Sequence, residues 1–342
     1  IRTNEKAVLI APLFLLFCSV EWTHYADAIN IYGVNPEDGF ANRTWDNVGV
    51  QYGLQALIDG QITKEEFLDL NTNVGSWKNE PDMVQEGCPF ISALCPDPAD
   101  LVGVDPFPGI WPNLIDPWSW RNMALSPDGG STPAPRASAD PGAIEAAYEH
   151  GLVFTGDLEI PVIDWRNYLE RELDMHNSHQ SFAARQRLLD HDGDASNQVI
   201  WFTDGNDHGD EFDQTPLAFE VIDEWMRNIE KYPWRSVAEN KPARAVDACF
   251  DAEGNLIYAG EDAWAGILDD EPAGPCTERF PVYSTSRIVA GGPISGDVFK
   301  CELQSVDEAI ARGVYGDVTF TPDEVARLRQ IFPDGVCDYS RR

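Results

Sequence analysis

The chain has 342 residues, with 58 Asp and Glu against 24 Lys and Arg, and a formal net charge of −34. This charge argues against a nucleic-acid partner, because binding to a phosphate backbone requires an excess of Lys and Arg. It indicates a solvated acidic surface suited to salty surroundings or, alternatively, a cation-binding face. With 43% hydrophobic residues, 16 Phe and 11 Trp, the chain can bury a large core and is expected to be globular.

The N-terminal region contains an apolar stretch at residues 7–20, preceded by Arg2 and Lys6 and followed by small residues at 26–28. This pattern is typical of a signal peptide, although the stretch is shorter than the roughly 20 residues that a membrane span needs. The interpretation that we favour is an uncleaved pair of buried strands in the core of the fold. Membrane association stays open.

Start and stop signals predict short helices along the first part of the chain. One helix ends before Gly60, and a capping box formed by Thr63 and Glu66 predicts another over 65–70. A third helix is expected over 143–151.

Residues 80–142 differ from the rest of the chain in composition: they are rich in proline and show little hydrophobic periodicity. We predict an irregular insertion or lid there, closed by a disulfide between Cys88 and Cys95. Three tryptophans of this segment either line a substrate entrance or pack the lid onto the body: Trp111, Trp118 and Trp120.

An alternation of apolar strands and helices follows and predicts an α/β fold. The expected order is strand 158–163, a loop rich in carboxylates and histidines over 164–179, helix 181–189, strand 198–203, a glycine-rich loop that contains His208, and helix 216–229. In an α/β-hydrolase, this order presents the last two members of a Ser–Asp–His triad, on loops at the carboxyl ends of the strands. The sequence therefore predicts the C-terminal portion of a mostly parallel α/β-hydrolase-type sheet.

The remaining cysteines pair by proximity in sequence. We expect Cys249–Cys276 around a hairpin turn at Gly254, and Cys301–Cys337 around a helix over 322–331 that Thr321 caps. Cys18 is left unpaired. The absence of a Cys-x-x-Cys pair argues against zinc ribbons and thioredoxin-like motifs, and three disulfides imply an oxidising compartment.

The chain divides into four expected parts. They are an N-terminal part of the hydrolase core (1–79), the lid (80–142), the core that carries the acid and histidine loops (143–230), and a loop-rich, disulfide-stabilised C-terminal extension (231–342).

Several long strings resemble a family of secreted bacterial α/β-hydrolase-like proteins of undefined function, and more distantly the tannase and feruloyl esterase group. They occupy residues 46–54, 160–166, 173–177, 290–301 and 331–339. The resemblance implies a nucleophilic serine on an elbow in an upstream half. This sequence departs from that pattern, since it has no Gly-x-Ser-x-Gly and no cysteine beside His208.

His208 is the candidate general base, because it follows a strand in a glycine-rich turn. Asp174, in the loop after the preceding strand, is the favoured acid partner. Asp164 is the rival, and Arg166 is expected to pair with it structurally.

Two sets of residues suggest metal sites, but neither has a complete ligand pattern. His176 and His179 stand at i, i+3, but no third ligand follows at a diagnostic spacing, so lining of the active-site cleft is favoured. Residues 190–194 resemble the start of a calcium loop without its twelfth-position glutamate, and we predict a helix-to-strand turn. No metal or cofactor is expected.

Two functions remain. The first is a secreted, periplasmic or cell-surface serine hydrolase that acts on a small or polymeric ester, with its serine on an upstream segment or companion chain. The second is a non-catalytic structural or interaction subunit derived from a hydrolase fold. The missing nucleophile favours the second hypothesis, and the Asp174 and His208 loops favour the first.

Overall fold

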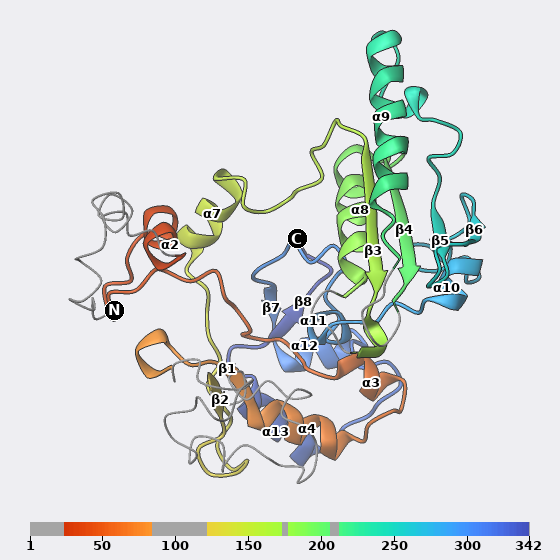
Figure 1. Cartoon of the computed structure of the whole chain (residues 1–342). Helices are drawn as coiled ribbons and strands as arrows, with labels where there is room; N and C mark the ends of the chain where they lie inside the picture. Colours follow the sequence, from red (N-terminus) through yellow and green to blue (C-terminus); the bar gives the residue numbers. More distant parts are fainter. Residues whose placement is uncertain (1–23, 84–121, 173–176, 206–211, 342) are drawn as a thin grey trace, which may run out of the picture.

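The computed structural model describes residues 24–83, 122–172, 177–205 and 212–341 (Figure 1). The apolar stretch at 7–20, Cys18, the Cys88–Cys95 pair and the three tryptophans of the expected lid lie outside these residues.

The centre of the fold is a four-stranded sheet in the order β3-β4-β5-β6. Its strands are β3 (Val162–Tyr168), β4 (Gln198–Asp204), β5 (Ala248–Phe250) and β6 (Leu256–Ala259). The first three are parallel to one another, and β6 returns antiparallel to β5. The predicted α/β arrangement of two parallel strands separated by a helix is therefore confirmed.

The first strand begins four residues later than predicted, at Val162 rather than residue 158. Pro161 has no N–H to donate, and the parallel ladder starts when the Val162 N–H donates to the carbonyl oxygen of Asn197, at 2.8 Å. The strand also ends five residues later than predicted, at Tyr168 rather than residue 163, so Asp164, expected just past the strand, lies within it.

Two helices cover β3 and β4, one on each face: α8 (His179–Asp192) and α9 (Thr215–Lys231) (Figure 1). Alternate residues of β4 point to opposite faces, so Ile200 and Phe202 pack with Phe182 of α8, while Val199 and Trp201 pack with Trp225 of α9. All seven residues of β4 are buried, as expected for an inner parallel strand.

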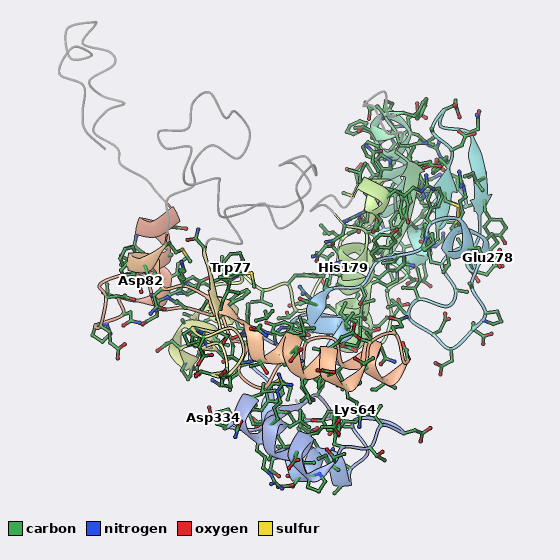
Figure 2. The ribbon with its side chains drawn as sticks, turned by 90° about the horizontal axis from the view of Figure 1, so that it is seen from below. Lys64, Trp77, Asp82, His179, Glu278 and Asp334 are labelled. Carbon is green, nitrogen blue, oxygen red and sulfur yellow. A yellow bond between two sulfur atoms is a disulfide. The ribbon has the colours of Figure 1, made fainter. Side chains whose placement is uncertain are left out.

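A second core is formed by segments from both ends of the described chain. The helices α3 (Leu54–Ile58) and α4 (Lys64–Asn73) pack against α12 (Val306–Ala311) and α13 (Pro322–Ile331). Helices α4 and α13 lie side by side, and Lys64 forms an ion pair with Glu324 at 2.9 Å (Figure 2). The predicted capping box forms at Thr63, and Thr321, predicted as an N-cap, forms a capping box with Glu324.

The rest of the fold consists of short strands, short helices and 3₁₀ turns. Two antiparallel pairs are formed by β1 (Val74–Trp77) with β2 (Met123–Leu125), and by β7 (Glu302–Gln304) with β8 (Val336–Asp338). The remaining helices are α2 (His24–Tyr32), α7 (Pro141–Glu149), α10 (Pro275–Arg279) and α11 (Ser286–Val289), with 3₁₀ turns η2 (Glu80–Asp82), η5 (Glu170–Glu172) and η6 (Ala238–Asn240).

Two predicted disulfides are confirmed. Cys249–Cys276 ties β5 to α10, and Cys301–Cys337 ties the residue before β7 to β8. The hairpin between β5 and β6 turns at Gly254, as predicted from the sequence.

Arg136 joins the second core to the irregular chain around it. Its guanidinium donates to the carbonyl oxygens of Asn47, at 3.0 Å, and Val50, at 2.6 Å. It also donates to the carbonyl and side-chain oxygens of Asn71, and its Cζ lies about 5 Å from the ring centres of Tyr52 and Phe332. Burial lowers the pKa of Arg136 to about 10. Carbonyl dipoles and aromatic faces, rather than a carboxylate, therefore stabilise this cation.

Replacing Arg136 with lysine should lower the free energy of unfolding by about 2–4 kcal/mol, because an ammonium cannot reproduce the planar fork and leaves buried carbonyls unpaired. Urea unfolding monitored by tryptophan fluorescence measures the change. Arg227→Lys is the control, since Arg227 is 75% exposed and should change stability by less than about 0.5 kcal/mol. Equal stability of the two variants would contradict this role.

Candidate active site at the carboxyl edge of β3 and β4

The carboxyl ends of β3 and β4 lie side by side, because Tyr168 and Asp204 are register partners. Gly205 follows β4 directly and packs against the exit of β3. A Cβ at Gly205 would lie only 2.9 Å from the Tyr168 carbonyl oxygen and 2.9 Å from Cδ2 of Leu169. The two segments that leave this edge therefore begin in contact, as a convergence of the two predicted loops requires.

The two predicted catalytic residues follow in those segments. Asp174 falls within 173–176 and His208 within 206–211, and both lie outside the described residues. Their convergence stays a prediction. The rival acid, Asp164, lies inside β3 opposite Ile200, with its Oδ1 3.6 Å from Nε of Arg166. The predicted structural pairing of Asp164 with Arg166 is confirmed.

The segment that contains Asp174 is anchored at both ends by a buried hydrogen-bonded pair. The Glu170 carboxylate accepts the Ser178 backbone N–H at 2.6 Å and the Ser178 hydroxyl at 2.8 Å. Glu170 is 2% exposed and Ser178 is fully buried. Nearby, the Arg166 guanidinium donates to the Asn177 carbonyl oxygen at 2.7 Å. These contacts fix where the segment starts and where it rejoins α8.

Asp204, the last residue of β4, is compensated by two arginines from distant parts of the chain. Nη1 of Arg171 lies 3.2 Å from one carboxylate oxygen, and Nη2 of Arg279 lies 2.7 Å from the other. Sequence reasoning missed this cluster, because Arg279 is 75 residues from Asp204 and no local pattern links them. The loop that contains His208 thus begins at a carboxylate that is already paired.

Tyr168, the last residue of β3, lies at the same edge of the sheet. Its hydroxyl donates to the Pro281 carbonyl oxygen at 2.6 Å, and its ring packs with those of Phe202 and Phe280. Burial and the neighbouring Glu170 raise the pKa of Tyr168 to about 12. The phenol therefore remains neutral and acts as a hydrogen-bond donor.

His179 is the first residue of α8 and is 7% exposed (labelled in Figure 2). Its Nδ1 has no hydrogen-bond partner. Burial, with a smaller contribution from the Arg166 cation, lowers the pKa of His179, so the ring is held neutral. His176, its companion in the metal hypothesis, lies outside the described residues.

The calcium-like string at residues 190–194 is a helix end and a turn. Helix α8 ends at Asp192, Gly193 is left-handed with φ of 71°, and the Asp194 carboxylate accepts the Ser196 backbone N–H at 3.1 Å. Within the described ranges, no three His, Cys, Asp or Glu side chains are grouped so that they could hold a metal ion.

Residues 18–342 match the model of a tannase-like family of unknown function. The chain belongs to this family. A search of curated proteins and a search of solved structures found no match. Membership gives the tannase-like chain a hydrolase-related origin and agrees with the resemblance drawn from its sequence.

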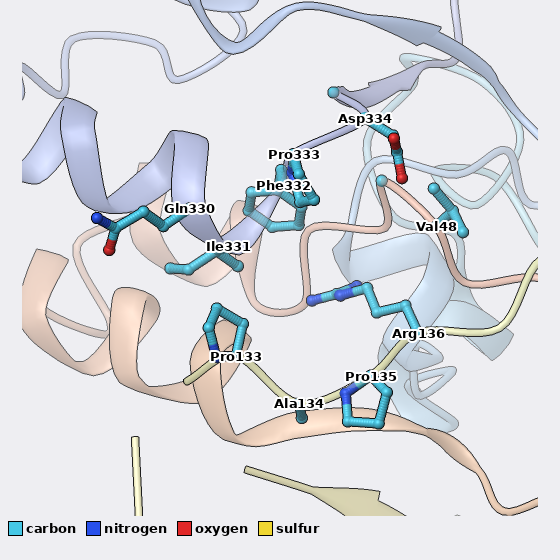
Figure 3. A pocket seen from close by; sticks show the side chains of 12 residues that line it. Val48, Pro133, Ala134, Pro135, Arg136, Gln330, Ile331, Phe332, Pro333 and Asp334 are labelled. Atoms are coloured by element: carbon cyan, nitrogen blue, oxygen red, sulfur yellow. The ribbon is translucent and has the colours of Figure 1, made fainter. Parts of the chain in front are cut away.

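Two cavities of the tannase-like chain lie elsewhere. One, of about 310 Å³, is lined by Arg136, Phe332 and Asp334 (Figure 3). The other, of about 470 Å³, is largely apolar and contains Trp45, Tyr52 and Trp77. Neither is lined by a residue of β3, β4 or their exits, so the structure does not join them to the candidate site.

No helix in the described part of the chain has the length and apolar character needed to cross a membrane. The two disulfides are consistent with an oxidising compartment.

Gly205→Ala should lower the free energy of unfolding by about 1–3 kcal/mol, because the added methyl group meets backbone atoms that cannot rotate away. Thermal or urea unfolding measures the loss. Gly142→Ala is the control: its Cβ would approach no backbone atom and one side-chain atom, the Asp140 Oδ1 that accepts the Ala143 N–H, at 3.2 Å. If Gly205→Ala is as stable as this control, the two exits are not in the contact described.

The protein should lose stability as the pH falls below about 6.5, partly through His179. The unfolded histidine binds a proton there while the buried ring, with its lowered pKa, resists one, so the unfolded state is favoured. His179→Gln should reduce the difference in unfolding free energy between pH 7.5 and pH 5.5. An unchanged difference would show that the His179 pKa is not lowered by folding.

Proposed function

We propose that this chain is the C-terminal part of a secreted serine ester hydrolase. The observation that supports the proposal best is the parallel pairing of β3 and β4, whose exits are in contact at Gly205. One exit leads to Asp174 and the other to His208, the last two members of a triad in the order that α/β-hydrolases use. A small or polymeric ester is the proposed substrate.

In the proposed reaction, His208 accepts the proton of a serine hydroxyl while the serine oxygen attacks the ester carbonyl carbon. The imidazolium then gives this proton to the leaving alcohol, and water repeats the cycle on the acyl-enzyme. Asp174 accepts the second N–H of the imidazole and keeps the ring in its working tautomer. The serine and the donors that stabilise the oxyanion come from an upstream segment.

The described residues support these roles indirectly. The Glu170–Ser178 pair fixes both ends of the Asp174 segment, which reduces the conformational freedom that the loop must lose in the reactive state. Arg171 and Arg279 occupy both oxygens of Asp204, so that this nearby carboxylate does not compete for the imidazole. Asp164 forms an ion pair with Arg166, whose Nε lies 3.6 Å from Oδ1 of the carboxylate.

The second candidate is a non-catalytic structural or interaction subunit that retains the fold. Its support is that no Gly-x-Ser-x-Gly occurs in the 342 residues. Both candidates place the protein outside the cell, in the periplasm or at the cell surface, where disulfides persist.

The test uses the protein as its host secretes it, with a fluorophosphonate probe and a chromogenic ester. Wild type should bind the probe covalently at a serine upstream of this chain and hydrolyse the ester. His208→Ala and Asp174→Asn should each lower kcat by about 10³-fold or more, because the base or its orienting partner is lost.

Asp164→Asn serves as the matched carboxylate control and should change kcat only a few-fold. Circular dichroism checks that all variants are folded. Absence of both labelling and hydrolysis in wild type would favour the structural subunit. Full activity of His208→Ala would refute the triad assignment.

A further inference from the structure

The end of helix α9 and the chain that follows it form a basic segment in an otherwise acidic molecule. Residues 227–244 contain five Lys or Arg and two Glu, a net charge of +3, whereas the whole chain has −34. Arg227 and Arg244 are neutralised by carboxylates of α9. Among the described residues, no carboxylate forms an ion pair with the other three cations, which are Lys231, Arg235 and Lys241. The local charge is therefore positive and largely uncompensated.

A tight turn presents Trp234 at the tip of this segment. The Arg235 N–H donates to the Tyr232 carbonyl oxygen at 3.0 Å and closes the turn, with Pro233 at its second position. Trp234 is 76% exposed, the highest value among the large exposed hydrophobic side chains of the described chain. Its ring meets that of Tyr232 edge to face, with centroids 5.7 Å apart. Most of the indole is thus open to solvent.

The turn is held in place by buried hydrogen bonds beneath it. Asn240 is 3% exposed, and its side-chain amide donates to three carbonyl oxygens within residues 232–236, at 3.1–3.3 Å. The indole N–H of Trp225, in the core, donates to the Val237 carbonyl oxygen at 2.8 Å. Because the turn is ordered in advance, little conformational freedom is lost when Trp234 meets a partner.

Two of the uncompensated cations flank the aromatic side chains of the turn. Nζ of Lys231 lies 5.0 Å and Cζ of Arg235 lies 4.6 Å from the centre of the Tyr232 ring. A hydrogen bond and the charge of Lys231, with a smaller effect of Arg235, lower the pKa of the Tyr232 phenol. Aromatic rings and positive charge are therefore combined on one protruding surface, the Trp234 turn (residues 231–235).

The Trp234 turn lies far from the candidate active site. Helix α9 has 17 residues and is about 25 Å long. Its C-terminal end extends beyond the strands on the side opposite to the arrowheads of β3 and β4 (Figure 1). The two surfaces therefore occupy opposite ends of the sheet.

We propose that the Trp234 turn binds the surface of a membrane that contains anionic phospholipids. The Trp234 indole would lie at the level of the headgroups, where tryptophan is favoured, and the cations would lie against the lipid phosphates. Charge complementarity supports this partner, because the segment is positive in a chain of net charge −34. Acidic groups elsewhere on the chain are screened beyond about 8 Å in physiological salt, so the local sign decides.

The shape of the turn favours a membrane over a small ligand or a peptide. Those partners bind in clefts and grooves, whereas this turn protrudes. Neither of the two cavities described above is lined by a residue of the segment 227–244. A bilayer surface deforms around a protruding tip and offers an apolar layer beneath an anionic one.

Binding at this end would leave the carboxyl edge of β3 and β4 directed away from the membrane. The candidate site would then remain open to a substrate while the protein is held at a surface. The inference does not depend on the proposed function, since it uses no residue of the candidate site.

The experiment is cosedimentation of the full-length protein with vesicles of phosphatidylglycerol or of phosphatidylcholine. Wild type should bind the anionic vesicles more tightly, and raised salt should weaken this binding. Trp234→Ala should weaken it about tenfold or more, because apolar burial is lost. Lys231→Gln and Arg235→Gln should each weaken it about fivefold.

Two control variants match these changes at other places. Phe219→Ala removes an aromatic side chain that is 69% exposed near the other end of α9, and Arg329→Gln removes an exposed cation on α13. Both should bind the vesicles as wild type does. Circular dichroism checks that every variant is folded.

Each other outcome overturns the proposal. Equal binding to the two kinds of vesicle, or no binding, excludes recognition of anionic lipid. Preference for phosphatidylglycerol that survives both Trp234→Ala and Arg235→Gln places the membrane contact elsewhere. Binding to polygalacturonate without binding to vesicles identifies an anionic polysaccharide as the partner. Self-association that Trp234→Ala abolishes, without vesicle binding, identifies a second copy of this chain.

Discussion

The parallel pairing of β3 with β4 is the constraint on which the candidate site depends. It brings residues 168 and 204 together and so makes the next segments neighbours. A slip of one residue would move Ile200 and Phe202 away from α8 and exchange them with Val199 and Trp201, so two buried faces fix the register. Hydrophobic packing on both faces of β4 therefore positions the two strand ends at the candidate site.

Buried charges of this acidic chain are compensated by specific partners. Near the candidate site, the buried acids are each matched: Asp204 by two arginines and Glu170 by a serine N–H and hydroxyl. In the second core the situation is reversed, since the Arg136 cation is stabilised by carbonyl oxygens and aromatic rings. Unpaired charge in either place would carry a desolvation cost that such contacts offset.

Sequence patterns predicted the elements that depend on interactions between residues close in sequence. The apolar strand predicted at 198–203, the capping box at Thr63, the N-cap at Thr321 and the pairing of Cys249 with Cys276 each correspond to an observed feature. The start of β3 was misplaced because Pro161 removes a ladder donor. The Asp204–Arg279 pair and the Arg136 contacts join residues far apart in sequence, so no window of sequence contains them. Asp174 and His208 were predicted from the order of elements alone.

The most direct test of the central claim is a crystal structure of the full-length protein after phosphonylation by a fluorophosphonate. The account predicts that the phosphorus atom lies at the carboxyl edge of β3 and β4, within hydrogen-bonding reach of the His208 imidazole, about 2.6–3.2 Å from a phosphonyl oxygen. The Asp174 carboxylate should accept the other ring N–H. A phosphonylated serine at any other part of the fold, or a His208 ring turned away from it, would contradict the account.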